Sequence, residues 1–219
     1  MYGGISMNRD LNFIYNRVSV RNYKEDIVPK EDIVEILKAG TYAPSGKNLQ
    51  NWHFVVLTNK DDIEAIAKEV ESKSNKLIEE IDDEELKSSF AKFVPYYTGF
   101  KKAPVLILVF ASEYPNTELN ILKAANASKE KLDKAVFSNP GIQNIGAAIE
   151  NILLSAAALG YGTCWMTGPN YAREEIENYI NFSKEGFELV AMTPLGVPAD
   201  KKSPQPKRKP IEEVVTFID

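Results

Sequence analysis

Three residues near the start of the chain, Arg17, Ser19 and Arg21, are of types that bind phosphate. They alternate with Val18 and Val20, which predicts an extended segment with all three on one face, because side chains two apart along a strand point to the same side. Two guanidinium groups and a hydroxyl can donate several hydrogen bonds to a dianion. The pattern also fits an exposed basic strand whose charges form surface ion pairs. The residues by themselves leave both interpretations open.

A second concentration of polar groups joins a predicted helix end to a predicted strand, over residues 43–54. The carboxamides of Asn48 and Gln50 can each donate and accept hydrogen bonds, so they could read the edge of a ring. Such side chains also commonly satisfy the backbone of an ordinary turn. The segment is therefore a candidate binding loop, with a structural turn as the alternative.

The single histidine, His53, and the single cysteine, Cys164, exclude several classes of site within one chain. Zinc sites typically need several His or Cys ligands, and a disulfide needs two cysteines, so neither is expected. A hydrolase using Ser19 or Ser45 with His53 is disfavoured, because these residues fall in different predicted elements and no nucleophile elbow is present. One unpaired cysteine, and a start without a basic and apolar leader, predict a cytoplasmic protein.

The sequence contains no nucleotide-binding loop of a known type. Gly160-Tyr161-Gly162 lacks a third glycine at the required spacing and follows a predicted helix, whereas a dinucleotide fingerprint follows a strand. A pyridine nucleotide would therefore have no domain of its own. With 26 Lys and Arg against 31 Asp and Glu, the net charge is −5, which predicts no nucleic-acid partner. The apolar stretch 142–159 contains Glu150 among other polar residues, so no membrane partner is expected.

The elements that must position these groups follow from hydrophobic periodicity and from helix and turn signals. Helices are predicted at about 9–15, from Pro29 to Gly40, over a charged stretch 61–92 broken near Ser74 and Asp82, at 142–159 and at 173–181. Strands are predicted at 52–58, 104–111, 163–166 and 187–195. The second strand is apolar on both faces and should be central. This irregular order favours an α+β fold over a doubly wound sheet.

A chain of 219 residues predicts one substantial domain. We expect that domain to span 1–219, with exposed, lid-like excursions at about 61–100 and 112–141. A proline-rich and basic tail, about 203–219, ends in apolar residues and should dock on another surface.

Taken in order, the motifs resemble those of the nitroreductase family of FMN-dependent oxidoreductases across nearly the whole chain. The similar segments are Arg17–Arg21, Pro44–Trp52, Gln143–Leu154, Gly160–Trp165, Leu195–Pro198 and Lys207–Glu213. Four residues depart from the family pattern: Val18 where a second base is common, Gly46 for a second Ser, Asn51 for Pro, and Asn144 for a frequent Asp. None of them removes the phosphate-binding groups, whereas Gly46 and Asn51 alter the loop expected at the flavin edge.

The resemblance implies an α+β fold, a central antiparallel sheet flanked by helices, and an intertwined homodimer with FMN sites at its interface. One subunit would hold the FMN phosphate and ribityl chain through Arg17, Ser19, Arg21 and Arg208. The other would contribute Pro44, Ser45, Gly46 and Asn48. The backbone around Thr167 and Gly168 would lie against the isoalloxazine near N5. The implied cofactor-binding set also includes Val18, Gln50 and Lys207.

The implied activity is electron transfer from NAD(P)H to nitroaromatics, quinones or related small molecules by a ping-pong mechanism. No catalytic side chain is expected, since the flavin carries the chemistry and the protein supplies binding and orientation. The tail after Arg208 would wrap the partner, and the excursions would roof the pocket and choose the acceptor. They contain six aromatic side chains suited to stacking: Phe90, Phe93, Tyr96, Tyr97, Phe100 and Phe137. The alternative is a flavin-binding protein with a sensor or narrow biosynthetic role and no broad reductase activity.

Overall fold

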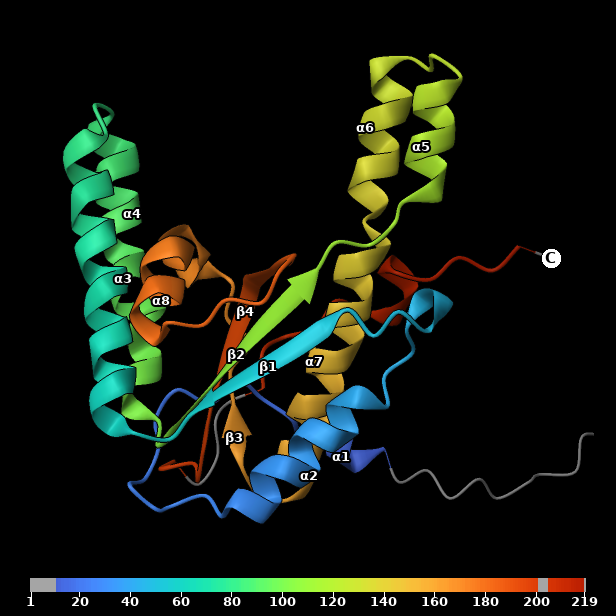
Figure 1. Ribbon diagram of the computed structural model, residues 1–219. Helices are drawn as coiled ribbons and strands as arrows, with labels where there is room; N and C mark the ends of the chain where they lie inside the picture. The colour runs from blue at the N-terminus through green and yellow to red at the C-terminus, as the bar shows by residue number, and fades with distance from the viewer. Residues whose placement is uncertain (1–10, 201–204, 219) are drawn as a thin grey trace, which may run out of the picture.

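A four-stranded antiparallel sheet organises the chain (Figure 1). The computed structural model describes residues 11–200 and 205–218. The strands are β1 (Trp52–Leu57), β2 (Val105–Ser112), β3 (Gly162–Thr163) and β4 (Phe187–Gly196), and their order in the sheet is β1-β2-β4-β3. The α+β class and the antiparallel sheet expected from the sequence are confirmed, and β2 lies inside the sheet as predicted.

Strand β2 is buried on both faces because successive side chains of a strand point to opposite sides of the sheet. Val105, Ile107 and Val109 join one hydrophobic cluster, whereas Leu106 and Leu108 join a second. Helices cover each face, so an uninterrupted apolar run suits this interior position.

Helices α2 (Lys30–Thr41) and α7 (Pro140–Ala158) cover the first face of the sheet, with the short α1 (Asn12–Asn16) beside them. Asn139 caps α7, because its side chain accepts a hydrogen bond from the N–H of Ile142 at 3.2 Å. Although α7 is rich in apolar residues, no helix in the described part of the chain is long and apolar enough to cross a membrane.

Gly40 does not end α2, contrary to the expectation from the sequence, but lies inside that helix. A Cβ at this position would lie 2.7 Å from Cγ1 of Ile152 on α7. The glycine therefore serves the close approach of the two helices, and α2 continues to Thr41.

Helices α3 (Lys60–Glu80), α4 (Glu84–Tyr97) and α8 (Arg173–Ile180) lie on the opposite side of the sheet from α2 and α7 (Figure 1). Two short 3-10 helices connect this layer to the strands along the sequence. Helix η2 (Gly99–Lys102) lies between α4 and β2, and η3 (Gly168–Ala172) lies between β3 and α8.

The prediction of an exposed excursion over 61–100 is wrong for α3. Ile66 and Val70 are fully buried and belong to the second hydrophobic cluster. The charges that suggested exposure occupy only the outer face of an amphipathic helix. The chain does break near Asp82, between α3 and α4, but Ser74 lies inside α3, where its hydroxyl donates to the Val70 carbonyl at 2.8 Å.

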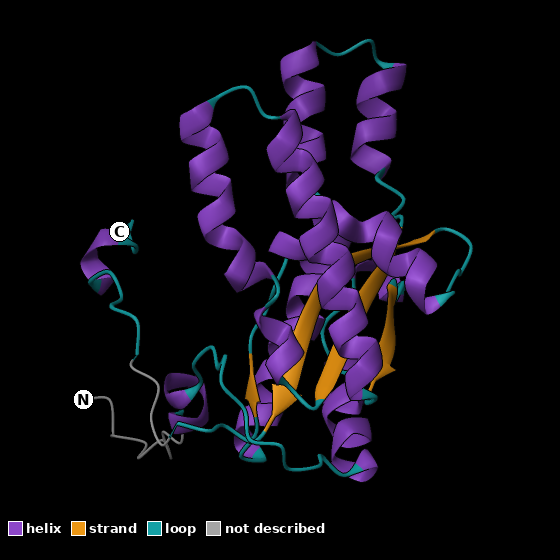
Figure 2. Cartoon of the chain, turned by 90° about the vertical axis from the view of Figure 1, so that its left-hand side faces the viewer, coloured by secondary structure: helices purple, strands orange, loops and turns teal. Residues whose placement is uncertain are grey.

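Helices α5 (Thr117–Ala124) and α6 (Lys129–Ser138) form a hairpin that projects from the rest of the chain (Figures 1 and 2). It lies within the second predicted excursion. In these two helices only Ala135 is buried, while Val136 and Phe137 are exposed. Burial within this one chain therefore contributes little to holding the hairpin in place.

The C-terminal residues extend away from the sheet and include one short helix, η4 (Ile211–Glu213) (Figure 2). Every residue from 205 to 218 is exposed, including Phe217 and Ile218. Large apolar side chains gathered in water commonly mark an interaction surface, so this tail is suited to packing on another molecule. Residues 9–10 of the first predicted helix, and 203–204 and 219 of the predicted tail, lie outside the described residues.

Candidate functional site

The segment Arg17–Arg21, here called the 17–21 segment, lies beside β3 at the edge of the sheet. Ser19 pairs with Thr163 in a parallel bridge, and the Val20 N–H donates to the Thr163 carbonyl at 2.8 Å. Val20 is buried, whereas Ser19 and Arg21 are exposed. Residues 19–21 therefore alternate between outward and inward side chains, whereas Arg17 and Val18 are both half-buried.

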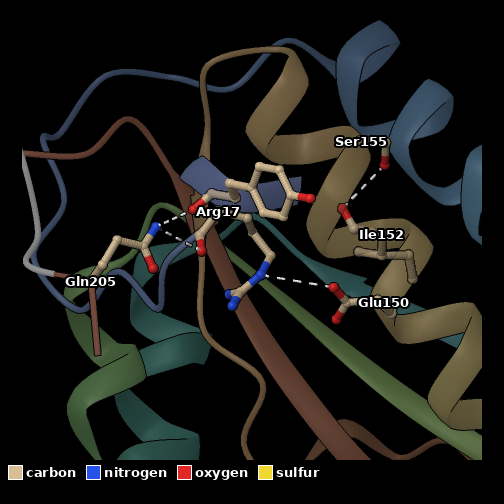
Figure 3. A network of polar contacts seen from close by, with 6 residues as sticks. Arg17, Glu150, Ile152, Ser155 and Gln205 are labelled. Atoms are coloured by element: carbon tan, nitrogen blue, oxygen red, sulfur yellow. Dashed lines mark hydrogen bonds and ion pairs between the residues drawn. The ribbon is translucent and has the colours of Figure 1, made fainter. Parts of the chain in front are cut away.

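Arg17 points toward α7, where its Nε lies 3.8 Å from Oε1 of Glu150 (Figure 3). The Arg17 side chain is 17% exposed. The separation is that of an ion pair and is too long for a hydrogen bond, so Glu150 does not occupy the hydrogen-bond donors of the guanidinium fork. Val18, the next residue, is half-buried.

The tail returns to the 17–21 segment through Gln205. Its Nε2 donates to the carbonyl oxygens of Tyr15 and Arg17, at 2.5 and 3.5 Å (Figure 3). Arg208 follows three residues later, so even a fully extended chain keeps its backbone within about 10 Å of this anchor. Lys207 and Arg208 are both exposed. The structure thus keeps two tail cations within reach of Arg17.

The turn from β3 into η3 carries two unused backbone donors. The N–H groups of Thr167 and Gly168 donate to no residue within 11–200 or 205–218. Met166, just before them, exchanges backbone hydrogen bonds with Met192 of β4, at 2.9 Å each. A Cβ on Gly168 would lie 2.3 Å from Cε1 of Tyr97, so only glycine leaves room for this ring. The turn is fixed by these contacts, while its two N–H groups have no acceptor among the described residues.

A cavity of about 440 Å³ lies between the 17–21 segment, the turn after β3 and the end of α4. Its lining includes Arg21, Cys164 and Met166, together with residues of the stretch 94–102. A concave site of this size that combines apolar walls with a few charged groups is typical of cofactor binding.

Tyr23 ties the 17–21 segment to the chain that follows β4. Its hydroxyl donates to the Val20 carbonyl at 2.5 Å, and its backbone pairs with Pro198 in an antiparallel bridge. Burial raises the pKa of the Tyr23 hydroxyl, so this group is a neutral donor at physiological pH. The segment that carries Arg21 is therefore held on both sides.

The loop Pro44–Gln50, here called the 44–50 loop, has an unusual backbone. Lys47, Asn48 and Gln50 all adopt left-handed conformations, with φ of 57°, 52° and 48°. Residues other than glycine rarely do so, and such conformations persist where the surrounding structure fixes them. Three of them within four residues indicate a loop whose shape is imposed.

Hydrogen bonds within the 44–50 loop and to α7 impose this shape. The Gln50 N–H donates to Oγ of Ser45 at 2.8 Å, and Gln50 Nε2 donates to Oδ1 of Asn48 at 3.1 Å. The Gly46 N–H donates to Oδ1 of Asn144 on α7 at 3.1 Å. The carboxamides of Asn48 and Gln50 thus partly satisfy each other, as in the structural alternative, yet both side chains remain exposed.

The predicted cofactor-binding residues form two separate groups in the chain. Arg17, Ser19 and Arg21 lie on the segment beside β3, and Arg21 lines one cavity with Met166, the residue before Thr167 and Gly168. The 44–50 loop, with exposed Pro44, lies at the N-terminal end of α7, whereas β3 follows the C-terminal end of that helix (Figure 1). Asn144, which contacts the loop, and Glu150, which pairs with Arg17, are about 9 Å apart along the helix axis. Within the described residues no hydrogen bond or ion pair joins the loop to the 17–21 segment.

The six aromatic residues singled out in the sequence have different surroundings. Phe100 is fully buried and unavailable for stacking on a ligand, which corrects that expectation. Tyr97 stacks on Phe93 with ring centroids 6.1 Å apart, and Phe90 meets Tyr171 edge to face at 5.4 Å. Tyr96 is exposed and lines the cavity, and Phe137 is exposed on the α5–α6 hairpin.

His53 belongs to an aromatic cluster. Its ring stacks on Phe182 at 5.2 Å, and its Nδ1 lies 3.3 Å from Nζ of Lys184. Burial, and then the charge of Lys184, lower the pKa of His53. The polar partner of His53 is thus a lysine. Ser45, a serine of the disfavoured hydrolase alternative, instead accepts a hydrogen bond from the Gln50 N–H. In the ranges 11–200 and 205–218, no group of three or more His, Cys, Asp or Glu side chains could hold a metal ion.

The sequence profile of the nitroreductase family matches residues 14–197. The chain belongs to the nitroreductase family. Among its nitroreductase-family relatives, a provisionally named NADH dehydrogenase/NAD(P)H nitroreductase of Archaeoglobus fulgidus is 28% identical over 197 residues, which cover 90% of this chain and 89% of that protein. Iodotyrosine deiodinase of Thermotoga neapolitana is 28% identical over 203 residues, with coverages of 92% and 95%.

Solved structures share the nitroreductase fold with this chain. A BluB-like flavoprotein from Clostridium difficile 630 superposes with a TM-score of 0.88 at 44% sequence identity, covering 95% of this chain and 98% of that one. A nitroreductase with bound FMN from Bacteroides fragilis NCTC 9343 superposes with a TM-score of 0.69 at 23% identity, covering 97% and 100%. The second likeness concerns the fold alone. The nitroreductase fold expected from the sequence is confirmed.

Sequence reasoning missed several polar residues that support this nitroreductase-family site. Glu150 orients Arg17, and Gln205 anchors the tail, yet neither was singled out for a role. Asn51 and Asn144 were noted only as departures from the family pattern, although they contact each other. The sequence signal for this contact was that both positions depart from the family pattern in the same chain.

Proposed function

We propose that this chain is an FMN-dependent oxidoreductase that transfers electrons from NAD(P)H to small-molecule acceptors. The observation that carries the proposal is that Arg17, Ser19 and Arg21 lie on one segment beside β3, and that Arg21 and the turn after β3, through Met166, line one cavity. Guanidinium and hydroxyl donors suit a phosphate, and backbone donors suit the electron-rich edge of a ring. Membership of the nitroreductase family and the FMN bound to the Bacteroides fragilis protein support FMN as the ligand.

The residues present fit this cofactor. The 17–21 segment would hold the phosphate and ribityl chain, and Lys207 and Arg208 would join it from the tail that Gln205 anchors. The Thr167 and Gly168 N–H groups would meet the isoalloxazine near N5. When bound, FMN supplies the hydride chemistry between NAD(P)H and an acceptor, so the chain needs no catalytic side chain of its own.

We further propose a homodimer in which each flavin site uses residues of both chains. The 44–50 loop and the 17–21 segment are separate groups in one chain, so the loop of a second chain would complete the site. A groove of about 490 Å³ between α1, α2 and α7, lined by residues such as Phe13, Tyr42 and Leu154, is suited to receive the partner. With the apolar tail, such an interface would exceed the roughly 2,000 Å² at which permanent interfaces begin.

Donor and acceptor would use one flavin face in turn. The absence of a dinucleotide fingerprint from the sequence supports this, because NAD(P)H then has no separate domain and must bind at the flavin itself. Steady-state kinetics should therefore give parallel double-reciprocal lines. Intersecting lines would indicate simultaneous binding of donor and acceptor.

The end of α4 and the α5–α6 hairpin would cover the acceptor. Tyr96 already lines the cavity in its own chain. Phe137 is exposed on a hairpin that projects from the body, where it could reach the site of a second chain (Figure 1). These two positions are the aromatic candidates for contact with an acceptor ring.

Absorbance of the purified protein tests the cofactor and the donor together. The protein should be yellow and release one FMN for each chain on denaturation, and anaerobic NADH or NADPH should bleach the flavin bands. Finding FAD, or no flavin uptake after FMN is added, would refute the proposal.

A panel of acceptors tests the finer part of the proposal. A quinone and a nitroaromatic represent the reductase activity, and a halogenated tyrosine represents the chemistry in the name of the Thermotoga neapolitana relative. Turnover of the first two supports the proposed function. Reduced flavin that passes electrons only to oxygen would favour the sensor or narrow biosynthetic role.

A further inference from the structure

Two buried carboxamides connect the 44–50 loop to the body of the protein. Asn144 on α7 is 8% exposed, and Asn51, just before β1, is 2% exposed. The Gly46 N–H donates to Oδ1 of Asn144 at 3.1 Å, and Nδ2 of Asn144 donates to Oδ1 of Asn51 at 3.0 Å. Nδ2 of Asn51 then donates to the carbonyl oxygens of Ser112 and Gly141, at 3.1 and 3.3 Å.

The backbone groups at the two ends fix the direction of every bond in this relay. The Ser112 and Gly141 carbonyls can only accept, so Asn51 turns its NH₂ group to them and its Oδ1 to Asn144. The Gly46 N–H can only donate, so Asn144 presents Oδ1 to it and NH₂ to Asn51. A carboxylate at either position would place one acceptor against another. Two asparagines satisfy both.

The Asn51–Asn144 pair is also compatible with the left-handed backbone of the 44–50 loop. Gln50 precedes Asn51 and has a φ of 48°. A proline at position 51 would push the residue before it toward an extended conformation, which Gln50 does not have. Asparagine at 51 thus allows the left-handed Gln50, and Asn144 then provides the donor that the Asn51 carboxamide needs. The two departures from the family pattern compensate each other.

We propose that the Asn51–Asn144 relay is a positioning device for the 44–50 loop, and that it sets how tightly the loop binds the FMN held by the 17–21 segment of the other chain. This inference rests on the proposed function. The loop needs such a device because three of its residues are left-handed and would otherwise relax. Because both asparagines are buried, they would act through the Gly46 N–H and not by touching the flavin.

Substitution of Asn144 by Asp tests the polarity of the relay. Near neutral pH the introduced carboxylate can accept from Gly46 but meets Oδ1 of Asn51, another acceptor, so FMN should bind about ten- to a hundredfold more weakly. Burial raises the pKa of a carboxyl group, so on acidification the new group becomes protonated and can donate to Asn51 again. The affinity of N144D relative to wild type at the same pH should therefore recover on acidification.

N144A is the matched control for this pH dependence. It lacks a donor at every pH, so its FMN affinity relative to wild type should be low and should not recover at about pH 5. Should N144D fail to fold, as checked by circular dichroism, N144A still tests the proposal, because it removes both bonds without placing a charge in the interior.

Trypsin cleavage after Lys47 reports on the loop without any flavin. In the apoprotein, N144D and N144A should be cut there at least about tenfold faster than wild type, because the loop is released from α7. Cleavage after Lys123, at the exposed end of α5, serves as the internal reference and should not change. S74A removes different buried hydrogen bonds, to Val70 and Tyr171, and should not change Lys47 cleavage.

These measurements separate the two proposals. Failure of wild type to bind FMN would refute the proposed function, whereas the Lys47 cleavage would still report on the relay. Unchanged cleavage in both Asn144 variants, or FMN affinities of N144D and N144A that stay equal at both pH values, would overturn the relay as a positioning device.

Discussion

Arg17 has a carboxylate for a neighbour although the site proposed for it binds an anion. Glu150 lies 3.8 Å from its Nε, close enough to orient the guanidinium and too far to occupy its hydrogen-bond donors. The tail approaches the same residue from another direction through Gln205. These neighbours explain how one arginine can be fixed in place and still available to a phosphate.

Substitution of Arg17 should therefore weaken FMN binding. Arg17→Ala should cost about ten- to a hundredfold in affinity, because a charge-assisted hydrogen bond contributes roughly 1.5–3 kcal/mol and 1.4 kcal/mol is tenfold. Arg208→Ala should behave in the same way. Arg17→Lys should recover only part of the loss, since an ammonium group lacks the planar fork. The measurement is an FMN titration of each apoprotein.

Arg173→Ala is the control for the arginine variants. It also removes an arginine from an ion pair, with Glu188, but neither residue belongs to the proposed site. Its FMN affinity should match that of wild type. Equal affinities for wild type, Arg17→Ala and Arg208→Ala would mean that the phosphate-binding residues have been assigned wrongly.

His53 should titrate below its ordinary pKa of about 6.5, because burial and the neighbouring Lys184 disfavour its charged form. It is the single histidine, so its ring-proton NMR signals report the pKa directly. Lys184→Met should raise the pKa only part of the way, since burial is the larger cause. A wild-type pKa at or above 6.5 would contradict the described surroundings.

The sign of the stability effect follows from the same shift. When the folded pKa lies below the unfolded one, the unfolded chain binds more protons, so His53 stabilises the fold above about pH 6.5 and this contribution is lost as the pH falls through the lowered pKa. Urea unfolding of wild type and His53→Phe should therefore differ in pH dependence in this range.

Elements with a strong local pattern were predictable from the sequence. Strands β1, β2 and β4 begin and end within one residue of the prediction, because apolar runs bounded by turn residues identify them. Strand β3 is shorter than the predicted 163–166, since Met166 pairs with β4 only as an isolated bridge. The α5–α6 hairpin was predicted only as an excursion, because its helices lack a buried face to impose a clear period.

The candidate site, too, was only partly predictable from the sequence. The phosphate-binding types at 17, 19 and 21 show in the sequence through their alternation alone. The relay of Asn51 and Asn144 does not, because its bonds join residues 93 positions apart. Contacts of this kind depend on tertiary packing, and no local pattern encodes them.

The crossing of α2 and α7 depends on Gly40. Gly40→Ala should destabilise the fold by about 1–3 kcal/mol through overpacking against Ile152, although alanine is the better helix former by about 1 kcal/mol. Urea unfolding measures the difference. Gly99→Ala is the control, because nothing lies within 4 Å of the added methyl group. A more stable Gly40→Ala variant would show that the helices do not need this close approach.

On the scale of the whole molecule, the rigid elements form the core, while the binding groups lie on loops and on a tail that one chain leaves exposed. The hydrophobic clusters fill both faces of the sheet. The residues proposed to bind FMN lie at its edge, on the 44–50 loop and on the tail. In the proposed homodimer, a second chain would cover the exposed apolar surface and complete this arrangement.

FMN retention should consequently depend on protein concentration. If each site needs two chains, dilution below the dimer dissociation constant releases the flavin, because ligand binding and assembly are linked by mass action. Flavin fluorescence and light scattering should change over the same concentration range. A chain ending at Pro210 should lose FMN at higher concentration than wild type. A stable monomer that keeps its FMN would rule out the shared site.

The separation of the 17–21 segment from the 44–50 loop also has a genetic consequence. In a hybrid dimer of one Arg17→Ala chain and one Asn144→Ala chain, one site contains both lesions and the other contains neither. Two defective alleles carried on separate gene copies should thus complement each other, and hybrids isolated through two different affinity tags should bind FMN tightly at half of their sites. A site built within a single chain would leave every site of the hybrid defective, and the alleles would fail to complement.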